Sequence, residues 1–240
     1  MSAQTTSYPF KSLIYQSSRL YNWLTRFLYD QKKKYMTIAK LIGNSSKRVL
    51  DIPCGTGYLA RYLNPSTIYE GWDLNYKFLK RIKKDWNKGR IRLKKVILKN
   101  NNVFNFKDYE EKDVIVLCDI LHHVYPKHIE LVENAKKHAK TVIICEPKVI
   151  NPQDNMNGHD FLAKCAIKII KIFPARLIKI MDFVLGDNDG INSYSNRNCW
   201  KYNEKSLIEL YNKMGFSKIY SFMDDYIGIW TEKNKNIIRS

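Results

Sequence analysis

The stretch RVLDIPCGTGYLA, residues 48–60, decides the expected fold of this chain. It starts as an apolar run that ends in Asp51 and continues through a loop that contains Gly55 and Gly57. A helix is expected to begin near Tyr58. Glycines let a backbone approach a ligand closely, and the free N–H groups at a helix start favour an anionic group. The order of strand, glycine loop and helix therefore indicates a ligand site at the end of the strand.

The chain up to residue 147 alternates short apolar runs with helix-like segments. Strands are expected at 48–52, 67–72, 92–98, 113–118 and 141–145, and helices at 58–63, 75–87 and 126–139, with a weaker helical pattern over 100–112. Strands that alternate with helices of this length form parallel βαβ units. The expected fold class is α/β, with a doubly wound sheet whose first five strands are parallel.

The length of 240 residues suits a single domain over 1–240. N-terminal helices are expected at 8–42, the ligand-binding core at 45–147, a helix-rich insertion at 148–197, and a C-terminal helix and hairpin at 198–233. Only Asp224 and Asp225 separate the last two apolar runs. So short a connection allows only an antiparallel pair of strands.

Asp73 supplies the first indication of the ligand. It lies 22 residues after Asp51, at the end of the second expected strand. An acidic residue at this spacing is placed to accept hydrogen bonds from ribose hydroxyls. The spacing therefore implies a cofactor that carries a nucleoside. Residues 55–60 also match the G-x-G-x-x-A fingerprint of dinucleotide enzymes, so a nicotinamide oxidoreductase remains a distant alternative.

Five motifs in order resemble those of class I S-adenosylmethionine-dependent methyltransferases. They are Asp51 with the CGTG loop at 54–57, GWDLN at 71–75, NNV at 101–103, DVIVLCDILHHV at 113–124 and TVIICEP at 141–147. The fourth is similar to the branch that includes quinone-biosynthesis and other small-molecule methyltransferases. The resemblance implies a Rossmann-like sheet of seven mostly parallel strands with a reversed last strand. It also implies a helical lid formed by the insertion.

The same resemblance implies S-adenosyl-L-methionine as cofactor and a set of residues that bind it: Asp51, Pro53, Gly55, Gly57, Asp73, Leu74, Asn102, Val103 and Asp119. The glycine loop would hold the methionine end, Asp73 the ribose, and Asn102 with Val103 the adenine. Pro53 stands where the family usually has its first glycine, so the loop lacks one backbone donor. Asn102 replaces a commoner aspartate, and its side-chain carbonyl still accepts a hydrogen bond.

His122 and His123 are the candidate catalytic residues. They follow the fourth expected strand, at the end of the sheet where ligands of open α/β folds bind. One of them is placed to act as a general base if the acceptor must lose a proton, whereas the alternative is that it caps the turn or packs under the cofactor. Glu146 either orients an acceptor or caps the turn at Pro147. His128, His138 and His159 are expected at the surface.

Several site types are not indicated. No set of His, Cys and carboxylate side chains has metal-ligand spacing, so no metal is expected. The five cysteines form no CxxC pair. The N-terminus lacks the pattern of a secretory signal, and no apolar run is long enough to cross a membrane. A reducing cytoplasm is the expected location.

The formal net charge of +18 needs an explanation. It indicates an anionic partner or a bias toward Lys codons, since only 10 of the 41 basic residues are Arg. The segment 160–185 is basic and amphipathic, which suits a lid over the acceptor or, alternatively, contact with an anionic membrane. A second basic cluster over 77–99 is most simply a solvated face, because few aromatic residues interleave with it for RNA stacking.

The function expected from the sequence is methyl transfer to a small-molecule or lipid-like acceptor by in-line displacement. Tyr15 and Tyr21 near the sulfonium, and Arg197, Trp200 and Tyr202 on the inner wall of the lid, are secondary candidates. Two alternatives remain open. One is an RNA methyltransferase that uses the basic surface, and the other is a non-catalytic subunit that binds S-adenosylmethionine.

Overall fold

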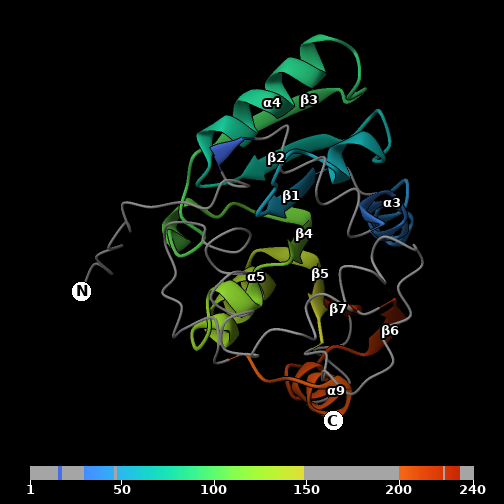
Figure 1. Cartoon of the computed structure of the whole chain (residues 1–240), viewed down its shortest axis with the longest axis vertical. Helices are drawn as coiled ribbons and strands as arrows, with labels where there is room; N and C mark the ends of the chain where they lie inside the picture. Colours follow the sequence, from blue (N-terminus) through green and yellow to red (C-terminus); the bar gives the residue numbers. More distant parts are fainter. Residues whose placement is uncertain (1–15, 18–29, 46–47, 149–199, 224, 233–240) are drawn as a thin grey trace, which may run out of the picture.

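The computed structural model describes residues 16–17, 30–45, 48–148, 200–223 and 225–232 (Figure 1). Seven strands in these residues form one sheet in the order β3-β2-β1-β4-β5-β7-β6. The strands are β1 (Arg48–Ile52), β2 (Ile68–Trp72), β3 (Lys95–Lys99), β4 (Lys112–Cys118), β5 (Ala139–Pro147), β6 (Lys218–Phe222) and β7 (Asp225–Thr231). This is the order of a sheet that starts in the middle and is wound outward in both directions.

The direction of each strand confirms the expected fold class. The pairs β1–β2, β2–β3, β1–β4 and β4–β5 are parallel, whereas β7 runs antiparallel to both β5 and β6. The last strand is therefore the reversed one. Because β7 starts opposite Pro147, at Asp225, the start of β7 lies at the same end of the sheet as the carboxyl ends of the parallel strands.

Four α-helices of the described residues cover the two faces of the sheet (Figure 1). They are α3 (Gln31–Ile42), α4 (Tyr76–Asn87), α5 (His128–Lys137) and α9 (Glu204–Lys213). Side chains of Asp30, Asn75 and Asn203 accept backbone N–H groups at the starts of α3, α4 and α9. The apolar sides of α3 and α4 belong to one buried cluster, and those of α5 and α9 to the other.

Two expected helices are wrong. The segment 58–63 forms only one 3₁₀ turn, η1 (Leu59–Arg61), and 100–112 forms only η2 (Phe106–Asp108). After η1 the Asn64 side chain accepts the N–H of Ser66 at 2.9 Å, and Pro65 has no N–H to donate. These groups close a turn where a helix would have to continue. The glycine loop therefore leads into a short turn, and no long helix begins there.

Other elements agree with their expected places within a few residues. The helix expected at 126–139 is the shorter α5, because β5 already begins at Ala139. Of the N-terminal helices expected at 8–42, the described part contains α3. The helical insertion expected at 148–197 lies outside the described residues, apart from residue 148. None of the described helices has both the length and the apolar character that a bilayer span requires.

Candidate active site

Four acidic residues stand in a row at the carboxyl end of the sheet. Asp73 follows β2, Asp51 lies near the end of β1, Asp119 follows β4, and Glu146 lies near the end of β5. The parallel registers place these strand ends side by side, about 4.8 Å apart from strand to strand. Ligands of open α/β sheets bind at this end, where the strand order reverses.

The glycine loop is fastened to Asp73. The N–H of Gly55 donates to Oδ2 of Asp73 at 2.9 Å, and the N–H of Asn75 donates to Oδ1 at 2.7 Å. Gly57 has a φ of 76°, and a Cβ there would lie 2.8 Å from Cγ1 of Ile82, so the position requires glycine. Pro53 joins β1 to this loop. The loop and the carboxylate that was expected to hold a ribose thus form one unit.

Asp51 is a buried carboxylate with an unusual environment. It is 1% exposed, and its Oδ2 accepts the hydroxyl of Tyr69 at 2.7 Å. Its Oδ1 is buried without a hydrogen-bond partner. Burial raises the pKa of Asp51 to about 7, with a further increase from the charge of Asp73 and a partial decrease from the Tyr69 bond. Oδ1 of Asp51 is therefore a buried acceptor, at the end of β1, that a donor group of a ligand can satisfy.

This environment predicts a pH-dependent gain in stability for Asp51→Asn. The usual pKa of 3.8 lies below the folded value of about 7, so ionisation penalises the folded state increasingly from pH 4 to pH 7, and fully above pH 7. Asparagine escapes this penalty and still accepts the Tyr69 hydroxyl. We expect the free energy of unfolding at pH 8 to rise by about 2 kcal/mol, which is less than the full pKa shift of Asp51 would give. The gain should vanish near pH 4, as measured by urea denaturation.

Asp85→Asn is the matched control, because Asp85 is also a 1% exposed aspartate. Burial alone would raise its pKa, but Arg81 and Arg61 outweigh burial, and the pKa lies below its usual value. The stabilisation by ionised Asp85 is present above the usual pKa and is lost as the pH falls through the lower folded pKa. We therefore expect Asp85→Asn to destabilise the protein at pH 8. Equal signs for the two variants would contradict the assignment of Asp51.

Asp119 is held by a lysine that the sequence did not reveal. Lys34 of α3 contacts Asp119 at 2.7 Å and Asp225 of β7 at 2.8 Å, and its side chain is only 7% exposed. Burial alone lowers the pKa of Lys34, but the charges around it, Asp119 first, leave that pKa well above its usual value. Asp119 itself has a φ of 55°. This ion triad fastens α3 across the ends of β4 and β7.

The residues expected around the adenine already accept hydrogen bonds from other groups of the protein. Oδ1 of Asn102 accepts the N–H of Phe104 at 2.9 Å, which closes a turn. Val103 is 7% exposed, and its carbonyl accepts the hydroxyl of Tyr109 at 2.8 Å. Leu74, directly after Asp73, is 39% exposed. An apolar side chain is thus presented next to the Asp73 carboxylate.

His122 and Glu146 form a buried pair. Nδ1 of His122 lies 2.6 Å from Oε2 of Glu146, whose side chain is fully buried. Oε1 of Glu146 also accepts the N–H groups of Ile120 and Leu121, at 2.7 and 2.8 Å. Glu146 therefore caps the turn after β4, not the turn at Pro147 that the sequence suggested, and at the same time fixes the imidazole of His122.

Aromatic side chains surround this pair. The rings of His122 and His123 lie 4.3 Å apart, and Trp200 lies 6.1 Å from His122. The expectation that His128 is at the surface is wrong. It is 2% exposed because it packs between Tyr125 and Trp200, and burial lowers its pKa. The candidates Tyr15, Tyr21 and Arg197 lie outside the described residues.

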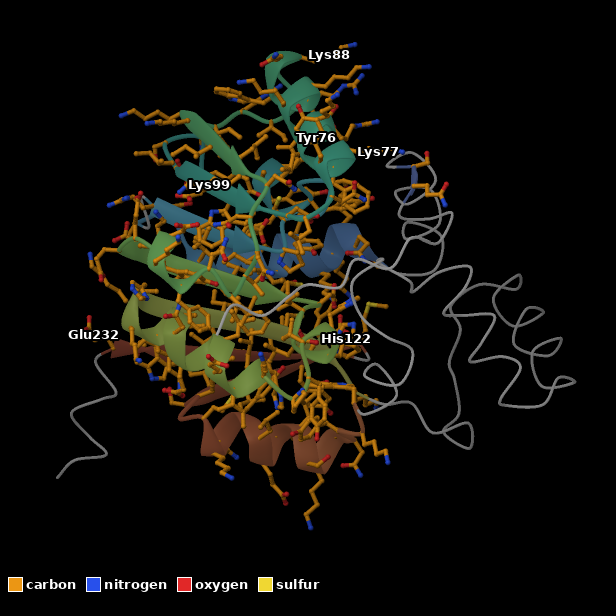
Figure 2. All side chains as sticks on the ribbon, turned by 90° about the vertical axis from the view of Figure 1, so that its left-hand side faces the viewer. Tyr76, Lys77, Lys88, Lys99, His122 and Glu232 are labelled. Atoms are coloured by element: carbon orange, nitrogen blue, oxygen red, sulfur yellow. The ribbon has the colours of Figure 1, made fainter. Side chains whose placement is uncertain are left out.

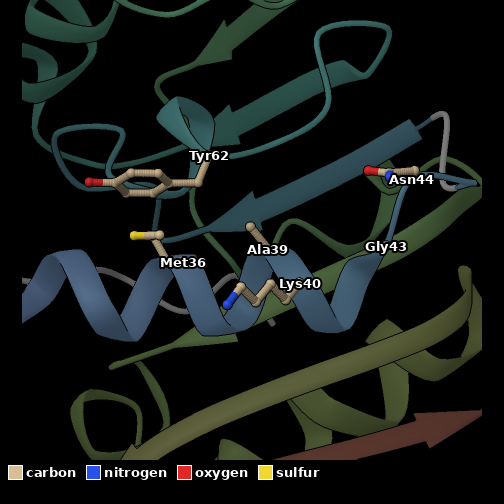
Figure 3. A pocket seen from close by; sticks show the side chains of 6 residues that line it. All are labelled: Met36, Ala39, Lys40, Gly43, Asn44 and Tyr62. Atoms are coloured by element: carbon tan, nitrogen blue, oxygen red, sulfur yellow. The ribbon is translucent and has the colours of Figure 1, made fainter.

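A shallow pocket of about 330 Å³ lies elsewhere, between α3 and the turn η1 (Figure 3). It is lined by Met36, Ala39, Lys40, Gly43, Asn44 and Tyr62. None of the expected site residues lines it, so the pocket carries no part of the site. In the part of the chain that the structure describes, no three His, Cys, Asp or Glu side chains are grouped in a way that could hold a metal ion.

Residues 50–141 match a family model described as a methyltransferase domain. The chain carries a class I methyltransferase domain. S-adenosylmethionine is the cofactor of such domains, as expected from the motifs, so residues 50–141 belong to an S-adenosylmethionine-dependent methyltransferase domain. The quinone-biosynthesis branch stays a prediction. No curated protein matches the sequence.

Solved methyltransferase structures share the fold. Magnesium protoporphyrin IX methyltransferase from Synechocystis, crystallised with S-adenosylhomocysteine, is 13% identical, with a TM-score of 0.56 and coverage of 87% of this chain and 85% of that one. An O-methyltransferase family protein from Burkholderia thailandensis is 14% identical (TM-score 0.56, 89% and 59% covered). A putative O-methyltransferase from Nostoc punctiforme is 15% identical (TM-score 0.58, 90% and 60% covered). This methyltransferase spans about three fifths of the latter two chains, and at these identities the likeness shows the fold alone.

Proposed function

We propose that this methyltransferase transfers the methyl group to a hydroxyl of a small-molecule or lipid-like acceptor, with His122 as general base. The observation that carries the proposal is the 2.6 Å contact between His122 and the buried Glu146. A base is needed only where the acceptor must lose a proton, as a hydroxyl does on methylation. One structural neighbour, magnesium protoporphyrin IX methyltransferase, acts on a small molecule, which is consistent with this class.

The row of strand ends supports an order for the bound cofactor. Asp73 would accept the ribose hydroxyls, and the exposed Leu74 beside it would cover one face of the adenine. A Cβ at Gly55 would meet no atom within 4 Å, so there is open space at the loop for the methionine end. The unpartnered Oδ1 of Asp51 is a suitable acceptor for the donor groups of that end. The residues at this end of the sheet therefore fit an S-adenosyl group.

The reacting methyl group would then lie over β4 and β5. S-adenosylmethionine supplies an electrophilic methyl group on a sulfonium. When Nδ1–H of His122 donates to Glu146, the lone pair of Nε2 is left to accept the proton of the acceptor hydroxyl. The buried Glu146 carboxylate stabilises the imidazolium that forms. The protein otherwise works by positioning acceptor and cofactor in line, which is the main requirement of such a displacement.

The test is methyl transfer from methyl-labelled S-adenosylmethionine to a panel of acceptors: simple phenols, quinols with and without a prenyl tail, primary amines and RNA. We expect labelled product with a phenol or quinol and little with the amines. Methylation of RNA alone would establish the RNA alternative, which the positive charge favours. Tight binding of S-adenosylhomocysteine without methylation of any acceptor would favour the non-catalytic subunit.

A further inference from the structure

Five lysines occupy the outward side of α4, at the end of the molecule far from α9 (Figure 2). Lys77, Lys80, Lys83, Lys84 and Lys88 are all exposed, while Phe78, Leu79 and Ile82 face the core. Arg92, Lys94 and Lys95, on the segment that leads into β3, are exposed as well. We call these eight residues the α4 basic face. A helix of twelve residues gives this face a length of about 18 Å.

Among the described residues, no carboxylate forms an ion pair with the α4 basic face. Between residues 74 and 100 the sequence has one acidic residue, Asp85, which is 1% exposed and already contacts Arg61, Arg81 and Arg90. Within the described residues none of the eight cations of the face forms an ion pair. An exposed array of like charges repels itself, which disfavours the folded state unless an anionic partner is bound.

We propose that the α4 basic face docks this protein onto an anionic lipid bilayer. Seven of its eight cations are lysines, which attract phosphate as point charges, whereas planar, bidentate recognition of nucleic acid favours arginine. Arg81 within α4 and Arg90 just after it are both engaged with Asp85. A cluster of this size on an amphipathic helix is typical of electrostatic binding to acidic headgroups.

The aromatic residues of α4 argue against single-stranded RNA as the partner. Nζ of Lys80 lies 4.7 Å from the ring centre of Tyr76, and Nζ of Lys83 lies 4.6 Å from that of Trp86. Each lysine covers a face on which a base would stack. Neither aromatic side chain is therefore free on that side. Docking by charge alone, without insertion of apolar side chains, should be strongly sensitive to salt.

The α4 basic face adjoins the carboxyl end of the sheet at Asp73, the residue that would hold the ribose. Tyr76 and Lys77 begin α4, three and four residues after Asp73 (Figure 2). Docking through α4 would therefore bring the carboxyl end of the sheet close to the bilayer surface. The proposal does not depend on which acceptor is methylated.

The test is co-sedimentation of the full chain with vesicles of phosphatidylcholine alone or with about 30% phosphatidylglycerol, at low salt and at about 0.5 M salt. We expect binding only to the anionic vesicles, and release by salt. Changing Lys80, Lys83, Lys84 and Lys88 to Gln should weaken this binding at least about tenfold.

The matched control changes Lys201, Lys205, Lys213 and Lys218 to Gln, four exposed lysines around α9 and β6 at the opposite edge of the sheet. It removes the same charge and should alter binding less than about twofold. Equal losses in both variants would overturn the proposal, because net charge alone would then be responsible. So would displacement of the protein from vesicles by equimolar duplex RNA, which would make RNA the partner.

Titration with S-adenosylhomocysteine distinguishes a loss of vesicle binding from a loss of the proposed cofactor site. Both lysine variants should bind it as the unchanged protein does, which also shows that they are folded. If the α4 variant does not fold, Arg92, Lys94 and Lys95 changed to Gln provide a second test of the same face, with an expected loss of at least about fivefold. Unchanged vesicle binding in that variant would also contradict the proposal.

Discussion

Replacing His122 by Gln is expected to lower kcat for methyl transfer to a phenol or quinol by about 10²- to 10⁴-fold, the usual contribution of a positioned base. Glutamine keeps a side chain of similar reach but cannot accept the proton. The affinity for S-adenosylhomocysteine should stay within about twofold, because the cofactor residues at β1 and β2 are untouched. The measurement is the initial rate with labelled cofactor, at saturating concentrations of both substrates.

Glu146→Gln tests the positioning of that base. Its Oε1 can still accept the N–H groups of Ile120 and Leu121, so the turn after β4 should persist. The amide cannot hold the imidazole in the same tautomer or stabilise its charged form, so we expect a loss of about 10- to 10³-fold in kcat. The measurement is the same initial rate with labelled cofactor that tests His122→Gln.

His123→Gln is the control, because its ring lies 4.3 Å from that of His122. We expect less than a fivefold change in kcat for this variant. A large loss in His123→Gln together with full activity in His122→Gln would assign the base to the neighbouring histidine. Equal activity of all three variants would contradict a base in this turn.

The topology of the sheet was predictable because each element has its own local signal. The strands of five to nine residues, the Asn75 cap of α4 and the short connection before β7 each leave a signal within a few residues of chain. The expected helix at 58–63 failed because its apolar spacing says nothing about the turn at Asn64 and Pro65 that stops it. Local turn chemistry prevailed over periodicity there.

The pairing inside the site was less predictable. His122 and Glu146 are 24 residues apart and meet only because β4 and β5 pair in a register that aligns Cys118 with Cys145. Lys34 has no sequence signal at all, since an isolated lysine on a helix is ordinarily solvated. Its burial depends on Asp119 and Asp225, which the fold brings to one place. The sequence motifs therefore predicted that the site lies at the carboxyl end of the sheet. Which charged side chains pair there depends on the tertiary structure.

Asp73→Ala is expected to weaken binding of S-adenosylhomocysteine by about 1.5–3 kcal/mol, or roughly 10- to 150-fold, as for lost hydrogen bonds to a charged group. Two effects add to each other. The variant removes the acceptor for the ribose hydroxyls, and it releases the N–H of Gly55 from its 2.9 Å bond, which loosens the glycine loop. Isothermal titration measures the change directly.

Asp113→Ala is the matched control. Asp113 also accepts a backbone N–H, that of Arg48 at 2.9 Å, but it does so at the amino end of the sheet. We expect Asp113→Ala to lose about as much folding stability as Asp73→Ala, with no change in affinity for S-adenosylhomocysteine. If Asp73→Ala binds as the unchanged protein does, the nucleoside lies elsewhere and the proposed cofactor site is wrong.

Binding of adenosine, which lacks the methionine end, distinguishes the contributions of the two ends of the site. If Asp73 holds the ribose, Asp73→Ala should lose affinity for adenosine as well as for S-adenosylhomocysteine. If the unpartnered Oδ1 of Asp51 faces the methionine end, Asp51→Asn should lose affinity for S-adenosylhomocysteine alone, by about three- to tenfold. Because the same substitution is expected to stabilise the protein at pH 8, weaker binding in a more stable variant would show that the fold retains a costly buried carboxylate for its ligand.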